Sequence, residues 1–282
     1  MGGDNFTAAD NHTLFKVSLT QKVASAVSAL AFLEIGLFPT EISIVGSPNV
    51  LKNGIFKLDD YLGRKVTLTE KLLFNFMLSL PFIIQHLTMS RMWFKEALQK
   101  CWRNYVFYER LLFNLVSSIS VLLMFGLYQT DDAVIFNVDF PFANVTWYAL
   151  FALGMFLCLW SMLDMGENDI LGFGLLKNFK KKKGSKFPAF VDVETKSILR
   201  ASCRHPLYFS MFIYNTFGPT IYTATRLGYI ITILIFVYIG AKLEEKGLKS
   251  IPGYTDYMKA TPNQFVPDVR VWVRGLKTLK KE

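Results

Sequence analysis

The chain has 282 residues, of which 52% are apolar and 26 are phenylalanine, and its formal net charge is +9. This apolar content excludes an ordinary soluble domain of this length and indicates an integral membrane protein. The basic residues concentrate beside apolar runs, where anionic lipid head groups attract them, so the positive charge does not require a nucleic-acid partner. Membrane lipids, including those with anionic head groups, are therefore the expected partners.

Six apolar runs approach the roughly 20 residues that a helix needs to cross the hydrocarbon layer. In chain order they are Val23 to Pro39, Leu72 to Met89, Leu111 to Tyr128, Val145 to Leu163, Pro206 to Tyr222 and Leu227 to Leu243. The sequence thus predicts an all-α, polytopic membrane bundle of about six helices whose last two form a C-terminal hairpin. Its expected parts are an N-terminal segment with the first span (1–69), a five-span membrane domain (70–267) and a basic tail (268–282).

The fifth run contains a potential break, because Gly218 and Pro219 stand about two-thirds of the way along it. Proline cannot continue a helical hydrogen-bond ladder, and the carbonyls that it frees must be met by protein or by a wet cavity. A short helix, a turn and one full helix are therefore an alternative to two continuous spans.

The charged loops predict an orientation in the membrane. Segment 91–110 holds five basic residues against two acidic ones, and segment 177–204 holds nine against two. An even number of spans places these segments and the N-terminus on one face, and the acidic loop around residues 131–139 on the other. Since basic loops face the cytosol or matrix, we expect that side for them, in either the endoplasmic reticulum and nuclear envelope or the mitochondrial inner membrane.

Cysteine and histidine are too sparse to organise the fold. The three cysteines, Cys101, Cys158 and Cys203, are scattered, which is typical of reduced thiols rather than of a disulfide framework. Cys203 precedes Arg204, so it is either a reactive thiolate or a bystander. With three histidines in the chain, no metal site is expected.

The most informative pattern is a set of charged residues at the ends of the C-terminal hairpin. Arg204-His205-Pro206-Leu207-Tyr208 opens the hairpin, and Glu244-Glu245 closes it. A charge at the bilayer centre costs roughly 2.5–3.5 kcal/mol, so these groups should pair or lie at an interface. The pattern predicts a polar site at the membrane surface. The alternative is structural: charged pairs at helix ends fix topology, and tyrosines anchor helices at interfaces.

The motif continues with Gly253-Tyr254, Tyr257 and Thr261-Pro262. In this order the residues resemble the isoprenylcysteine carboxyl methyltransferase-like superfamily, nearest its methanethiol S-methyltransferase and nurim branch. In the second predicted span, Gln85-His86 followed by Thr88-Met89 resembles a pattern of that branch. The resemblance extends from about Leu72 to Pro262 and is strongest over the last sixty residues.

The resemblance implies a helical membrane methyltransferase that uses S-adenosylmethionine, without a metal, and S-methylates a small or lipidic thiol. An apolar acceptor would enter from the bilayer. The implied catalytic residues are Arg204 and His205, with His205 orienting the pocket or assisting deprotonation of a thiol. The implied cofactor-binding residues are Arg204, His205, Tyr208, Glu244, Glu245, Tyr254 and Tyr257. Either glutamate would meet the amino group or ribose, Arg204 the carboxylate, and the tyrosines the sulfonium or adenine.

The chain departs from the family pattern at three positions. Ser210 stands where the family has glycine, Pro252 where it has phenylalanine, and Thr261 where it has valine. These changes leave the charged residues intact but alter the predicted pocket walls. They leave open a second interpretation, in which the chain is a non-catalytic accessory subunit of a large organellar membrane complex, such as a mitochondrial respiratory assembly. Its partners would then be the other subunits of that complex.

Overall fold

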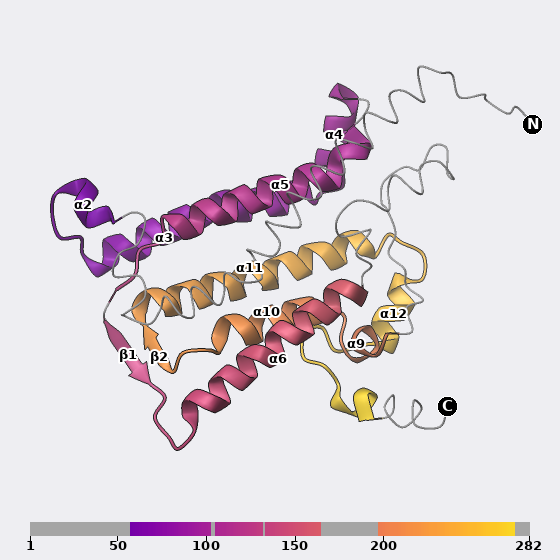
Figure 1. Ribbon diagram of the computed structural model, residues 1–282. Helices are drawn as coiled ribbons and strands as arrows, with labels where there is room; N and C mark the ends of the chain where they lie inside the picture. Colours follow the sequence, from indigo (N-terminus) through magenta and orange to yellow (C-terminus); the bar gives the residue numbers. More distant parts are fainter. Residues whose placement is uncertain (1–56, 103–104, 132, 165–196, 274–282) are drawn as a thin grey trace, which may run out of the picture.

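The computed structural model describes residues 57–102, 105–131, 133–164 and 197–273. This part of the chain is mostly helical, and its long helices lie alongside one another in the order α5, α3, α11, α10, α6 (Figure 1). The long elements are α3 (Leu68–Met89), α5 (Tyr105–Gly126), α6 (Ala143–Asp164), α10 (Pro206–Thr216) and α11 (Ala224–Leu248). The short ones are α2 (Leu58–Leu62), α4 (Met92–Cys101), α9 (Ile198–Ser202), α12 (Tyr254–Ala260), β1 (Val134–Asn137) and β2 (Ile221–Thr223).

Within the described residues, three helices are long and apolar enough to cross a membrane, which indicates an integral membrane protein. They are α3, α6 and α11, and they contain the second, fourth and sixth predicted runs. In α5, which covers most of the third run, the apolar stretch is Leu112–Met124. The first run lies outside the described residues, so the total of six spans stays a prediction.

Two of the spanning helices begin at threonine caps. The Thr67 hydroxyl accepts from the Glu70 amide at 3.3 Å, and the Glu70 carboxylate accepts from the Thr67 amide at 2.8 Å, which is a reciprocal capping box. Thr223 caps α11 by accepting from the Arg226 amide at 3.3 Å. Such caps satisfy amides that lack a partner in the first helical turn, and each stabilises a helix by about 1 kcal/mol. They fix where the apolar helices start.

The predicted break in the fifth run is confirmed. Helix α10 ends at Thr216, and Gly218 adopts φ +125°, a conformation that favours glycine. The buried Arg226 guanidinium donates to the carbonyls of Thr216 at 2.9 Å, Pro219 at 2.8 Å and Ile221 at 2.6 Å. The freed carbonyls are thus met by a protein side chain, and the alternative of short helix, turn and full helix is the one found.

The prediction of an all-α fold was wrong in one respect. Strands β1 and β2 pair antiparallel, with Phe136 opposite Tyr222 and Asn137 opposite Ile221, and form a small ribbon at the end of the bundle far from α12 (Figure 1). The Phe136 and Tyr222 rings stack with centroids 4.4 Å apart. Beta-branched and aromatic residues favour such pairing. The apolar run Val134-Ile135-Phe136, within the acidic loop, carried this signal in the sequence.

Candidate active site

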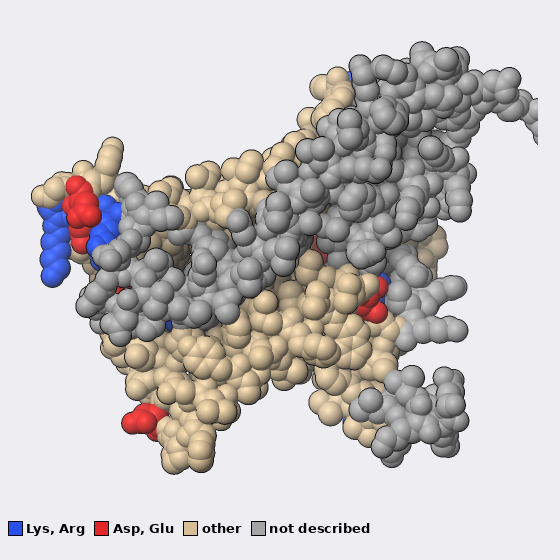
Figure 2. Space-filling model, viewed as in Figure 1, with Lys and Arg blue, Asp and Glu red and all other residues tan. Residues whose placement is uncertain are grey.

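The hairpin motif lies where α9, α10, α11 and α12 meet, at one end of the bundle (Figure 1). On the visible described surface, charged side chains show near this end and near the α2 end, and a broad uncharged band separates them (Figure 2). This distribution fits helices that cross an apolar layer and expose their charged ends. The candidate site therefore lies at a charged end of the helical bundle.

The centre of the site is a buried cluster of three charged or titratable side chains. Arg204 Nε donates to Glu245 Oε1 at 2.7 Å, and His205 Nε2 lies 3.0 Å from the same oxygen. The side chains are 9%, 8% and 7% exposed for Arg204, Glu245 and His205 respectively. Because an unpaired buried charge is costly, the cluster holds together residues that are about forty positions apart in the sequence.

Arg204 also fastens the segment that follows α12. Its Nη1 donates to the carbonyls of Thr261 at 2.8 Å and Pro262 at 2.6 Å. The backbone amides of Arg204 and His205 donate to the carbonyls of Asn263 and Gln264, both at 2.9 Å. The guanidinium thus bridges α11 and the segment after α12, and two of its three nitrogens are engaged with protein acceptors.

A second carboxylate beside this cluster is open to solvent. Glu244 is 46% exposed, and its Oε2 accepts from the Tyr208 hydroxyl at 3.0 Å. The same oxygen lies 3.7 Å from His205 Nδ1. The His205 and Tyr208 rings stack with centroids 5.1 Å apart. An exposed carboxylate next to stacked aromatic faces suits a cationic ligand group.

The predicted tyrosines of α12 lie beside the cluster but in a supporting position. Tyr254 is 3% exposed, and its ring contacts that of Tyr257 at a centroid distance of 5.7 Å. The Tyr257 hydroxyl donates to the Arg200 carbonyl at 2.9 Å, and burial raises the pKa of Tyr257 to about 12. The structure therefore brings Arg204, His205, Tyr208, Glu244 and Glu245 into direct contact. Tyr254 and Tyr257 support them from α12.

Two residues at the site were not among those predicted. Arg91, the N-cap of α4, donates from Nη1 to the Leu243 carbonyl at 2.9 Å. In the sequence it is only one of the five basic residues of segment 91–110. The Phe265 ring lies 5.9 Å from the His205 ring, centroid to centroid. Its only signal in the sequence was its place shortly after Thr261-Pro262.

Two of the three departures from the family pattern, Ser210 and Thr261, are accommodated. Ser210 is fully buried, and its hydroxyl donates to the Leu207 carbonyl at 2.6 Å, so the polar atom that replaces a glycine hydrogen is satisfied. Thr261 contacts Arg204 through its carbonyl, which any residue at that position would supply. Within the described residues, no group of three metal-ligating side chains is present.

Cys203 is expected to be inert. It is 0% exposed, and burial raises the pKa of its thiol to about 11, whereas Cys101 is exposed. The thiolate is the nucleophile, so raising the pH from 7 to 9 should leave Cys203 unreactive. Peptide mapping after maleimide treatment of the folded protein should find Cys101 modified and Cys203 modified only after unfolding. Rapid modification of Cys203 in folded protein would show that its thiol is accessible.

The fold and the site together define a class: a helical integral membrane protein with a buried Arg-His-Glu cluster at one end of its bundle. Comparison with known proteins gives the family. The chain is 30% identical over 203 residues to methanethiol S-methyltransferase of Pseudomonas deceptionensis, covering 71% of this chain and 74% of that protein. The chain belongs to the methanethiol S-methyltransferase family.

Two further relatives are also named as methanethiol S-methyltransferases. Methanethiol S-methyltransferase of Crocosphaera subtropica is 29% identical over 188 residues, covering 64% of this chain and 69% of that protein. Methanethiol S-methyltransferase 1 of Bradyrhizobium diazoefficiens is 27% identical over 209 residues, covering 73% and 70%. No family model and no solved structure matches the chain.

Proposed function

We propose that this chain is a membrane-embedded methyltransferase that uses S-adenosylmethionine to methylate a thiol, and that it belongs with nurim to the isoprenylcysteine carboxyl methyltransferase-like superfamily. The observation that best supports this is the buried Arg204, His205 and Glu245 cluster beside the open Glu244 carboxylate, in a chain whose relatives are named as S-methyltransferases. Those names favour an enzyme over the accessory-subunit alternative.

The residues present fit the cofactor. S-adenosylmethionine has a cationic sulfur, an ammonium group, a carboxylate and an adenine. Glu244 would hold the ammonium group or the ribose, since it is half-exposed and accepts a hydrogen bond from the neutral Tyr208 hydroxyl. The aromatic faces of His205, Tyr208 and Phe265 suit the sulfonium or the adenine. Arg204 would meet the carboxylate with the nitrogen that it does not use on Glu245 and on the carbonyls after α12.

The chemistry requires positioning more than covalent participation. When bound, S-adenosylmethionine supplies a methyl group on a cationic sulfur, so an in-line displacement needs no enzyme-bound intermediate. Glu245 and Arg204 keep the pocket walls in place by joining α11 to the segment after α12. His205, with a carboxylate near each ring nitrogen, orients the pocket. Correct placement of two reactants can supply several kcal/mol of a barrier.

Calorimetry of detergent-solubilised protein tests the proposal. We expect micromolar binding of S-adenosylmethionine, weakened about 10- to 100-fold in Glu244→Gln, because a hydrogen bond to a charged group contributes about 1.5–3 kcal/mol. Asp256→Asn is the matched control, since it removes the same charge from an exposed side chain in the nearby α12. Folded wild-type protein that binds no cofactor would contradict the proposal.

A further inference from the structure

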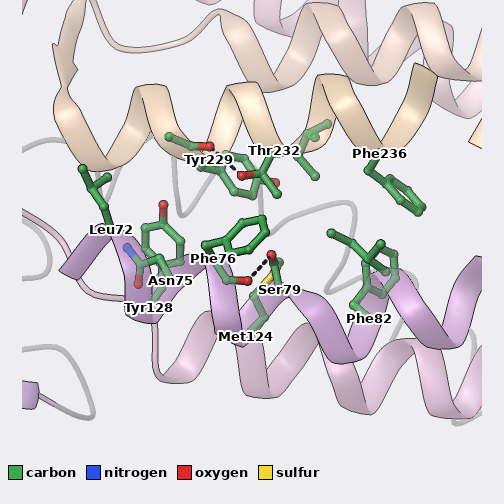
Figure 3. Close-up of a pocket in the computed structure, with 13 residues that line it drawn as sticks. Leu72, Asn75, Phe76, Ser79, Phe82, Met124, Tyr128, Tyr229, Thr232 and Phe236 are labelled. Atoms are coloured by element: carbon green, nitrogen blue, oxygen red, sulfur yellow. Dashed lines mark hydrogen bonds between the residues drawn. The ribbon is translucent and has the colours of Figure 1, made fainter. Parts of the chain in front are cut away.

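A cavity of about 130 Å³ lies between α3, α5 and α11 (Figure 3). Its walls are mainly apolar, with Phe76, Met124 and Ile233 among the lining residues. Two hydroxyls in the wall donate to carbonyls of their own helices, Ser79 to Phe76 at 2.7 Å and Thr232 to Gly228 at 2.8 Å. The cavity therefore suits a compact apolar group, and apolar cavities of roughly 150 Å³ can hold benzene.

Phe82 and Phe236 line one end of this cavity and also contact a half-buried histidine, His86. The His86 ring lies 5.4 Å from the Phe82 ring, 5.3 Å from the Phe236 ring and 4.8 Å from the Phe113 ring, centroid to centroid. Its Nδ1 is buried and has no hydrogen-bond partner among the described residues. Because an unsatisfied buried polar atom is costly, this nitrogen is a candidate ligand contact.

One face of α11 extends from the surroundings of this histidine to the candidate active site. Phe236, Gly240 and Glu244 are spaced four residues apart, so they share one face of α11. A Cβ placed on Gly240 would meet a single neighbour within 4 Å, the Tyr208 hydroxyl at 4.0 Å. Tyr208 in turn donates to Glu244. Gly240 thus leaves room on this face of α11, between Phe236, which contacts the His86 ring, and the exposed carboxylate of Glu244.

Two arginines, Arg91 and Arg110, act electrostatically on both His86 and Tyr208. Arg91 also ties the end of α3 to α11 through the Leu243 carbonyl. Along α3, His86 therefore follows the residues that line the cavity and precedes Arg91, which is bonded to α11 beside Glu244.

We propose that the cavity between α3, α5 and α11 binds the apolar group of the methyl acceptor, a thiol with a side group larger than methyl and up to about the size of benzene, whose sulfur lies at His86. This inference rests on the proposed methyltransferase function. The thiol donates its hydrogen to the acceptor nitrogen of His86. On transfer, the proton passes to that nitrogen, the new sulfur–carbon bond forms from the thiol's electrons, and the cofactor's carbon–sulfur bond breaks with its electron pair remaining on the cofactor sulfur.

Photo-crosslinking with a diazirine-bearing butanethiol tests the cavity without relying on turnover. Label should map to α3 and α11 peptides that line the cavity, and excess butanethiol should remove it. Ser79→Leu, which fills the cavity, should lower labelling about 10-fold and leave S-adenosylmethionine affinity unchanged. Label that persists in Ser79→Leu, or that lies on helices other than α3, α5 and α11, would overturn the inference. Wild-type protein that is labelled in the cavity but binds no cofactor would instead contradict the proposed function.

Kinetics of His86→Phe test the histidine separately. This change keeps an aromatic ring among Phe82, Phe113 and Phe236 but removes the acceptor nitrogen. We therefore expect kcat with butanethiol to fall about 100-fold at pH 7, with cofactor affinity unchanged. The loss should shrink at a pH above the pKa of the thiol, where the proton no longer needs an acceptor. Unchanged kcat, or a loss equal at all pH values, would show that His86 only packs.

Discussion

Replacing Glu245 with alanine is expected to destabilise the protein by about 3–5 kcal/mol, because the change leaves the Arg204 guanidinium buried without its carboxylate. The same change removes the 3.0 Å contact to His205 and loosens the segment after α12, which Arg204 also holds. Cofactor binding should be lost together with stability. The thermal unfolding midpoint in detergent, followed by tryptophan fluorescence, measures the first effect, and calorimetry measures the second.

Glu244→Ala is the matched control on the neighbouring residue of α11. Glu244 is half-exposed and its loss buries no unpaired charge, so the unfolding midpoint should stay within a few degrees of wild type. Cofactor binding should nevertheless weaken. If Glu244→Ala and Glu245→Ala lowered stability equally, the assignment of a structural role to Glu245 and a ligand-binding role to Glu244 would be wrong.

Gly154→Leu is expected to separate α6 from α10. A Cβ at Gly154 would lie 2.6 Å from the Tyr214 amide nitrogen, 2.9 Å from the Tyr214 Cβ and 3.0 Å from Ile213 Cγ2. The nearest atom is backbone and cannot turn aside, so the helices must move apart. Overpacking of this kind costs about 1–3 kcal/mol, and a full leucine against backbone should reach at least the upper value.

The expected readout for Gly154→Leu is a lower unfolding midpoint and weaker cofactor binding, because α10 begins at the candidate site with His205 as its cap. Gly126→Ala is the control, since a Cβ there meets nothing within 4 Å. Gly154→Leu protein with the stability of Gly126→Ala would contradict the close packing of α6 on α10.

Sequence reasoning predicted the parts of this molecule that depend on long apolar periods or on a recognisable order of charges. Helices α3, α6 and α11 follow from uninterrupted apolar runs, and the break at Gly218-Pro219 follows from proline chemistry. The contact between Arg204 and Glu245 was foreseeable, because charges at the two ends of an apolar hairpin must pair or lie at an interface.

Other features depend on tertiary contacts that no local pattern contains. Arg226 meets three carbonyls at the break, although in sequence it is merely a base at the start of a helix. The ribbon of β1 and β2 joins segments about ninety residues apart. The environment of His86, with three phenylalanine rings from three helices, appears only once α3, α5 and α11 pack together. These positions are set by packing and not by propensity.

Methyl transfer by purified protein in liposomes tests the central claim most directly. Protein would be incubated with methyl-labelled S-adenosylmethionine and, in separate reactions, methanethiol, butanethiol and benzenethiol. The account predicts labelled methyl thioether and S-adenosylhomocysteine in equal amounts, and far less of both with Glu244→Ala. Folded protein that transfers no methyl group to any of these thiols would contradict it.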